Sequence, residues 1–277
     1  MLLLLEFVVA RFDQTNNPYY TNFGSDSTIC PEDGQCLDGT FNFLCADDSM
    51  KQSPDCKRFV PIPVSLRTVS RMVNVHNGLR NKMAHGLRLS NMNLVYWNIH
   101  LQRMAEAYLY LCRPYKDTCL VIGYSGIAVG QNTIYVPKRK MEVLKEWEGR
   151  AVRHWYLELG SSISSPDELM GQKDWAKLEN FTQLFWPKLQ FIGCGAAIMF
   201  DGFFVVCYYY PSAQNESITQ AFTYLGPNEI CVCPEERVMC SLLFTSLCGI
   251  DLEFYNGIGE ISMDIHQFTP ILFNIYQ

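Results

Sequence analysis

The stretch GCGAAIMFDGFFVVCYYYP, residues 193–211, contains two runs of strand-forming residues on either side of Asp201-Gly202. Branched and aromatic residues favour strands, and Asp-Gly between two such runs is a strong hairpin signal. With a two-residue turn, Cys194 and Cys207 lie on the same face of the hairpin, one pleat apart. A disulfide between the strands is then sterically plausible. The stretch therefore predicts an antiparallel hairpin within a small sheet.

Three segments outside the hairpin show helical spacing of their apolar residues. The first begins near Leu66 and closes at "AHG", and the others lie within residues 96–112 and 137–159. A short strand, "GIAVGQNTIYVP", lies between the second and third. Helices before and around a small antiparallel sheet predict an α+β layered domain over residues 58–227.

The composition is that of a globular protein, with 48% hydrophobic and 18% charged residues in a chain of 277. This length predicts one main domain, since no repeat of solenoid period is visible. The net charge of -6 has no long acidic run behind it, and the densest basic cluster is only Lys138-Arg139-Lys140. Such a short cluster is typical of a solvated helix start, so nucleic acid is not a predicted partner.

Twelve cysteines occur in local clusters rather than as Cys-x-x-Cys pairs with downstream histidines. This pattern favours a disulfide framework in an oxidising compartment over a zinc site. Residues 16–57 form a predicted cysteine-rich extension, because the part from Cys30 to Cys56 is rich in Asp, Gly, Ser and Pro. Residues 228–249 form a second cysteine-rich segment, and residues 250–277 are an apolar tail without interpretation.

The first fifteen residues, MLLLLEFVVARFDQT, contain an apolar run too short to span a bilayer. We interpret them as a secretory signal peptide, cleaved or truncated, and predict a secreted monomer without a transmembrane anchor. Two Asn-x-Ser/Thr triplets, at Asn180 and Asn215, are candidate glycosylation sites of such a protein.

A set of motifs occurs in an order that resembles the CAP superfamily, the cysteine-rich secretory, antigen-five and pathogenesis-related proteins with an SCP domain. The motifs are "VHNGLRNKMAHG", "MNLVYWNIHLQRMAEAYLYLCRPYKDTC", "VGQN", "FTQLFWPKLQFIGCG" and "FFVVCYYYP". The resemblance covers about residues 58–227 and implies a three-layer α-β-α sandwich and secretion. The lead-in and the tail are similar to insect antigen-five-like (venom allergen-like) proteins.

That similarity also implies a set of disulfides. It pairs Cys30 with Cys45, Cys36 with Cys119, Cys56 with Cys112, and Cys194 with Cys207. The partners among the four tail cysteines stay open: Cys231, Cys233, Cys240 and Cys248.

The resemblance further implies a central cavity, which in many members holds two histidines and two acidic residues and in some relatives takes zinc. The corresponding positions here are Lys116, Gln131, Glu158 and Asn180, so three of the four groups are replaced. Lysine is protonated near neutral pH and asparagine is a poor zinc ligand. We therefore expect no zinc site, no other cofactor and no catalytic residue.

We expect these positions to form a polar cavity floor with an ion pair between Lys116 and Glu158. An ordinary glutamate titrates far below neutrality, so the set lacks a general base suited to neutral pH. Asn180 is either a glycosylated surface residue or a cavity residue with an accidental triplet, and the family position favours the cavity. His76 and Asn77 lie at core spacing on the first helix and are predicted to make structural hydrogen bonds.

Aromatic residues give a second set of hypotheses. Phe181, Phe185, Trp186 and Phe191 are expected in the core, with Trp186-Pro187 as an alternative groove edge. The three tyrosines of "CYYYP" alternate between strand faces, which predicts at least one outward ring as a partner contact.

Two functions fit these observations. The first is a secreted, non-enzymatic protein that binds an amphipathic ligand of the sterol, fatty acid or eicosanoid type. The alternative is a secreted factor that binds an extracellular protein in reproduction, saliva, venom or immunity, with variable loops as contacts. A hydrolase is disfavoured, because no serine or cysteine has the sequence context of a nucleophile.

Overall fold

The fold is taken from a computed structural model, which describes residues 29–46, 51–123, 126–137, 146–159, 178–213, 218–234 and 239–251. The elements are η2 (Phe43–Cys45), β1 (Val60–Ile62), α1 (Leu66–Leu87), β2 (Tyr96–Trp97), α2 (Ile99–Tyr110), β3 (Val121–Ile122), β4 (Ile127–Ala128), β5 (Gly130–Pro137), α3 (Trp147–Tyr156), η4 (Leu157–Leu159), α5 (Glu179–Phe185), β6 (Phe191–Met199), β7 (Gly202–Tyr210) and α6 (Ile218–Ala221).

The sheet is built on the predicted hairpin of β6 and β7. Strand β5 pairs with the free edge of β7, and β1 and β2 pair with different ends of β6. All of these pairings are antiparallel except that of β2 with β6. The hairpin therefore occupies the middle of the sheet.

The turn of the hairpin lies one residue earlier than the Asp-Gly motif predicts. Met199 pairs with Gly202, so Phe200 and Asp201 form the turn, and Phe200 takes the left-handed conformation with a φ of 52°. Gly202 belongs to β7, where a Cβ would collide with the ring of Tyr135. The glycine thus permits close packing of β5 on β7. The turn predicted from the Asp-Gly motif is therefore displaced by one residue.

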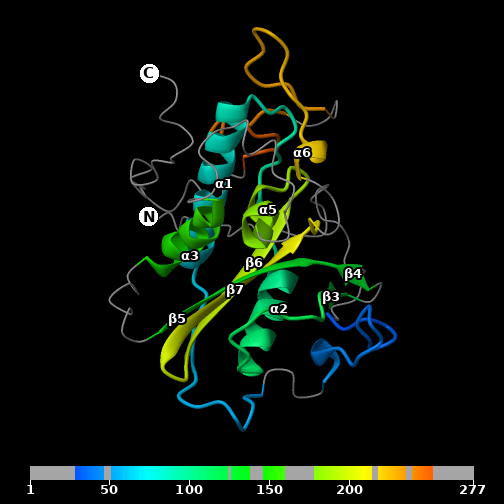
Figure 1. The fold of residues 1–277 in the computed structure, drawn as a ribbon, viewed down its shortest axis with the longest axis vertical. Coiled ribbons are helices and arrows are strands. Elements are labelled where there is room, and N and C mark those ends of the chain that lie inside the picture. Colours follow the sequence, from blue (N-terminus) through cyan, green and yellow to red (C-terminus); the bar gives the residue numbers. More distant parts are fainter. Residues whose placement is uncertain are drawn as a thin grey trace, which may run out of the picture.

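Helices cover both faces of the sheet, with α1, α3 and α5 on one side of the strands and α2 on the other (Figure 1). Alternate residues of β7 pack into the two cores. Phe203, Val205, Cys207 and Tyr209 face α1, α3 and α5, whereas Phe204, Val206 and Tyr208 face α2. The α+β prediction of a three-layer α-β-α sandwich is confirmed.

The two glycines around Cys194 fit the close approach of α2. A Cβ on Gly193 would overlap the backbone at Leu101 and Gln102, and one on Gly195 would press on Leu109. The Gly-Cys-Gly motif therefore allows α2 to lie directly on β6.

The first helix follows its prediction closely, whereas the third is shorter. Ser65 caps α1 through its side chain, and Arg88 ends it in the left-handed conformation with a φ of 54°. Helix α3 begins at Trp147, and the turn of η4 follows it. Part of the predicted third helix, including the basic cluster at Lys138, lies outside the described residues.

All twelve cysteines form disulfides. The structure contains the four pairs that the family resemblance implies, and in the tail Cys231 is joined to Cys240 and Cys233 to Cys248. Cys194 lies directly opposite Cys207 in the ladder rather than one pleat away. The two cysteine-rich regions lie toward opposite ends of the molecule, the N-terminal one in blue and the C-terminal one in orange (Figure 1).

Tyr208 and Tyr209 are both fully buried, so the prediction of at least one outward ring among the three tyrosines rests on Tyr210. Alternation turns one of two adjacent rings outward only if one sheet face is bare, and here helices cover both faces. Tyr210, at the end of β7, is half-buried. Among the described residues, no helix is long and apolar enough to cross a membrane. The signal peptide and Asn215 lie outside the described residues, and the domain boundaries stay predictions.

Candidate functional site

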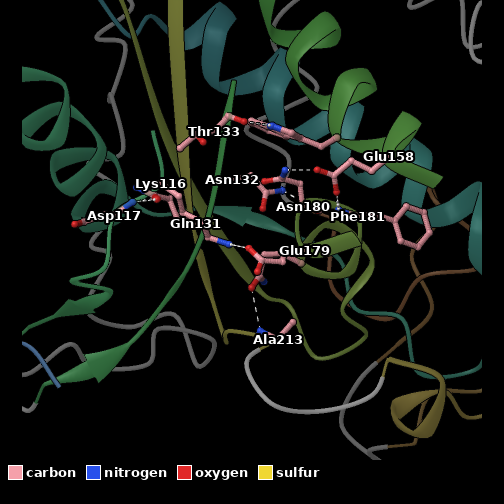
Figure 2. A network of polar contacts seen from close by, with 12 residues as sticks. Lys116, Asp117, Gln131, Asn132, Thr133, Glu158, Glu179, Asn180, Phe181 and Ala213 are labelled. Carbon is pink, nitrogen blue, oxygen red and sulfur yellow. Dashed lines mark hydrogen bonds and ion pairs between the residues drawn. The ribbon is translucent and has the colours of Figure 1, made fainter. Parts of the chain in front are cut away.

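The four positions that correspond to the family cavity come from separate elements near the first residues of β5. Gln131 lies on β5, Glu158 on η4 and Asn180 on α5, while Lys116 lies on the loop after α2. Figure 2 shows these side chains together with the polar contacts that they make to their neighbours. The family resemblance thus indicates a real cluster of polar residues, although the contacts differ from those expected.

Glu158 is held by α5. One carboxylate oxygen accepts a hydrogen bond from the side-chain amide of Asn180, and the other accepts from the backbone N–H of Phe181 at 2.9 Å. That N–H lies in the first turn of α5, where backbone donors have no partner within the helix. The carboxylate therefore caps α5 and fastens it to η4.

Lys116 does not pair with Glu158, so the predicted ion pair is wrong. Its ammonium contacts the carboxylate of Glu179, the first residue of α5. Both side chains of this pair are well exposed, at 39% for the lysine and 54% for the glutamate. No sequence pattern indicated Glu179, because the choice between two nearby carboxylates depends on the placement of η4 and α5.

Gln131 is buried and joins the loop after α2 to β7. Its carbonyl oxygen accepts from the N–H of Asp117 at 2.7 Å, and its amide nitrogen donates to the hydroxyl of Tyr208 at 2.9 Å. Burial raises the pKa of the Asp117 carboxyl, opposed by hydrogen bonds from the backbone at Cys119 and Thr118. Burial, reinforced by the charge of Asp117, also raises the pKa of Tyr208 well above its usual value.

Asn180 is half-buried, and both its side chain and its backbone have partners. Its backbone carbonyl oxygen accepts a hydrogen bond from the side-chain amide of Asn132 at 2.9 Å. Its side-chain amide nitrogen, the atom to which a glycan would attach, donates to Glu158. Asn132 is fully buried on β5, next to Gln131. The asparagine therefore connects β5 to η4 through α5.

The chemistry of this set does not fit a zinc ion. Lys116 offers an ammonium, and Gln131 and Asn180 direct amide N–H groups at their neighbours, so three positions present donors where a metal needs lone pairs. In the described part of the chain, one group of potential ligands has metal-like spacing, namely Cys231, Cys233 and Cys240. These sulfurs are held in disulfides, which leaves no thiolate to bind a metal.

The residues of the His-Asn-x-x-Arg motif on α1 form a separate, buried cluster. The ring nitrogens of His76 contact the carbonyl of Met72 at 2.7 Å and the hydroxyl of Tyr209 at 3.2 Å. The amide of Asn77 exchanges two hydrogen bonds with the backbone of Val95. Both residues therefore have structural partners, as the sequence predicts.

Arg80 belongs to the same motif, but its role as a buried hydrogen-bond donor was not predicted from the sequence. Its five N–H groups donate to backbone carbonyls of Asn93, Leu184, Trp186 and Pro187. Leu184 and Trp186 lie at the C-terminal end of α5, where free carbonyls carry partial negative charge. Burial lowers the pKa of Arg80 to about 9. Trp186 itself is buried, which fits the core interpretation rather than a groove edge.

The sequence of residues 73–209 matches the CAP family, described as the cysteine-rich secretory protein family. The chain belongs to the CAP superfamily. It is similar to Venom allergen 5 of Vespula vidua, 27% identical over 203 residues that cover 66% of this chain and 95% of the relative. It is also 25% identical to Venom allergen 5.02 of Dolichovespula maculata over 212 residues, covering 70% of this chain and 93% of the relative.

Solved structures share the fold of this CAP protein. The structure of BmVAL-1 superposes with a TM-score of 0.52 at 19% identity and covers 68% of this chain and 97% of that one. This likeness concerns the sandwich alone. The family match and the similarity to the venom allergens make the chain an antigen-five-like CAP protein.

Proposed function

We propose that this CAP protein is secreted, acts without catalysis and binds a small amphipathic ligand of the sterol, fatty acid or eicosanoid type. The observation that carries the proposal is the contact set of Glu158. Both of its oxygens accept hydrogen bonds that fasten α5, and its neighbour Asn180 is a donor rather than a base. A carboxylate used in this way supports a structural and binding role.

Secretion is supported by the cysteines. Every cysteine of the chain is in a disulfide, and such density is typical of proteins that fold in oxidising compartments. The similar relatives are named as venom allergens, and venom proteins leave the cell.

An amphipathic ligand is supported by an aromatic cluster beside the polar network. Tyr156 packs against Phe181 and Phe185, with ring centroids 6.3 Å and 5.8 Å away. Phe181 follows Asn180, so aromatic rings and amides are adjacent on α5. Tyr156 is half-buried, and burial raises its pKa to about 12, which keeps its hydroxyl a neutral donor. Aromatic walls with a few polar groups are typical of small-molecule sites.

A second candidate function, the binding of an extracellular protein, is favoured by a different observation. Leu37, Phe41 and Tyr115 are exposed apolar side chains on two loops that the Cys36–Cys119 disulfide joins. Exposed aromatic and leucine side chains on loops are frequent protein contacts.

Native mass spectrometry of the secreted, non-reduced protein tests the proposal. We expect a hydrophobic adduct of defined mass at one per chain, and no retention of added zinc. Changing Tyr156 to Ser should lower the adduct occupancy, whereas Phe41→Ser should leave it unchanged. A chain without adduct would refute the ligand proposal and favour the protein partner, and stoichiometric zinc would overturn the non-catalytic interpretation of Lys116 and Asn180.

A further inference from the structure

The two disulfides of the C-terminal region, which we term the tail disulfide pair, lie against each other. The Sγ atom of Cys233, which is joined to Cys248, is 3.8 Å from the Sγ atom of Cys240, which is joined to Cys231. The sulfurs of Cys231, Cys233 and Cys240 all lie within 4.8 Å of one another, and no other three cysteines of the described chain do so. A sulfur freed from one bond of the pair therefore has the other bond within reach.

Three of the four cysteines in the pair are accessible from solvent. Cys231, Cys233 and Cys240 are half-buried, whereas Cys248 is only 3% exposed. A thiolate exchanges with a disulfide by direct attack on one of its sulfurs, so the reaction requires access to that sulfur. Both residues of the Cys231–Cys240 bond meet this requirement, and this bond is the expected point of attack.

Cys248 is placed to remain in the fold as a free thiol. Its backbone N–H donates to the carbonyl of Met92, and its own carbonyl accepts from the N–H of Leu94, both at 2.8 Å. These bonds do not involve the sulfur, so they hold the residue after its disulfide is opened. The Sγ atom lies 3.3 Å from the carbonyl oxygen of Ser90, which is able to accept the hydrogen of a thiol. The structure thus accommodates Cys248 without its disulfide partner.

We propose that the tail disulfide pair is an exchange site for small thiols. The thiolate of such a compound attacks the Sγ atom of Cys231, forms a mixed disulfide there and releases Cys240 as a thiolate. Cys240 then attacks Cys233, 3.8 Å away, which forms a new disulfide between the two and displaces Cys248. The displaced sulfur takes a proton from water. Each step exchanges one S–S bond for another, so one thiol is consumed, one thiol is formed and no further oxidant or reductant is needed.

The Cys30–Cys45 disulfide provides a contrast within the same molecule. Both of its residues are half-buried, like those of the Cys231–Cys240 bond, but no third cysteine of the described chain forms a group of this spacing with them. A sulfur freed there attacks back on the mixed disulfide, which expels the small thiol and restores the original bond. In the tail, the neighbouring disulfide captures the freed sulfur at a high effective concentration. The adduct should therefore accumulate in the tail.

Incubation of the full, disulfide-bonded chain with reduced glutathione at mildly alkaline pH tests this proposal. The reaction is stopped with acid, the protein is unfolded, free thiols are blocked with N-ethylmaleimide, and the linked peptides are identified by mass spectrometry without reduction. We expect glutathione on Cys231, a Cys233–Cys240 linkage and maleimide on Cys248. Modification of the Cys30–Cys45 disulfide should be at least about tenfold lower.

The double variant Cys233→Ser, Cys248→Ser removes the bond that captures Cys240. The glutathione adduct at Cys231 should then fall by at least about tenfold, because the freed sulfur restores the original bond. Near-ultraviolet circular dichroism and the intact mass verify that the variant keeps its fold and its remaining disulfides. If the variant does not fold, the comparison with Cys30–Cys45 in the unchanged protein still decides the question.

Three outcomes would overturn the proposal. Glutathione on Cys231 with the Cys233–Cys248 bond intact would contradict the capture step. Equal modification of the tail disulfide pair and of Cys30–Cys45 would show that solvent access alone decides the reactivity. Absence of any adduct would refute the site. None of these outcomes bears on the hydrophobic adduct sought by native mass spectrometry, so the ligand proposal is judged separately.

Discussion

The polar cluster on α1 and the polar network around Glu158 contain similar residue types but differ in burial and in partners. His76, Asn77 and Arg80 are buried and bond largely to backbone carbonyls, whereas Lys116, Glu158 and Asn180 are exposed or half-buried and bond largely to other side chains. The α1 cluster therefore joins elements of the core. The Glu158 network lies at the edge of the sandwich, where water can replace its contacts at a lower cost in free energy.

The contrast shows why a buried charge can be structural. The guanidinium of Arg80 has no room for water, so its charge depends on the carbonyls that receive it. Two of these carbonyls lie at the C-terminal end of α5, the same helix that Glu158 caps at its first turn. Helix α5 is thus held at both ends, once by each cluster.

The largest effect is expected from Arg80→Met. The change removes the guanidinium donors of four carbonyls, of which those of Trp186 and Pro187 keep bonds from the backbone N–H groups of Leu189 and Asn93. Each buried acceptor left without a donor costs about 1–3 kcal/mol, so we expect a loss of several kcal/mol. Guanidinium denaturation of the oxidised protein measures the loss. Arg103→Met, on the exposed face of α2, is the control and should change stability by under about 0.5 kcal/mol. Equal losses in the two variants would contradict the assigned role of Arg80.

The next effect is a dependence of stability on pH through His76. Burial lowers its pKa to about 4 in the folded protein, with Arg80 adding a smaller repulsion and the carbonyl of Met72 opposing both. In the unfolded chain an ordinary histidine takes its proton near pH 6.5, so between these values the unfolded state binds more protons. The contribution of neutral His76 to the free energy of unfolding is on the order of 3 kcal/mol. It is fully present above about pH 6.5 and is lost as the pH falls toward 4.

Denaturation midpoints at several pH values between 7 and 4 measure this slope. His76→Gln should flatten it, whereas His154→Gln, on the exposed face of α3, should leave it unchanged. Asp117 contributes in the opposite direction, because burial raises its pKa, but it is present in every variant and cancels in the comparison. A slope that His76→Gln does not reduce would show that another group titrates.

The smallest effects are expected in the Glu158 network. Glu158→Gln replaces one acceptor by an N–H group facing the donors of Asn180 and Phe181, which should cost about 1–2 kcal/mol. Lys116→Met removes an exposed ion pair and should cost under about 1 kcal/mol. Thermal unfolding of the two variants beside the unchanged protein compares them. If Lys116→Met proved the more costly, the network would depend on the ion pair rather than on the cap of α5.

The elements of the sandwich could be predicted well, because apolar spacing and glycines reflect local needs. The first helix, the hairpin and the layered class follow from such patterns. The turn at Phe200 was misplaced, since Gly202 is required by the ring of Tyr135 on a strand distant in sequence. Tyr208 and Tyr209 are both buried, which the alternation rule could not predict because it does not say how many faces of the sheet the helices cover.

The sequence predicted which positions form the polar network, but it did not predict which contacts they make. The family pattern located Gln131, Glu158 and Asn180, and the lack of imidazoles argued against zinc. It did not indicate that Lys116 would contact Glu179, nor that Asp117 and Tyr208 would join the network. Such choices depend on distances of a few ångströms between separate loops, which no local pattern encodes.

The sequence by itself determined the superfamily, the α+β class and the residue types of the polar network around Glu158, because each depends on order and local spacing along the chain. The tertiary structure alone decided which carboxylate meets Lys116, which carbonyls receive Arg80 and which leucines stay in water. These outcomes are set by how helices and loops from distant segments pack, and the free energy of a polar group depends on the neighbours that packing supplies.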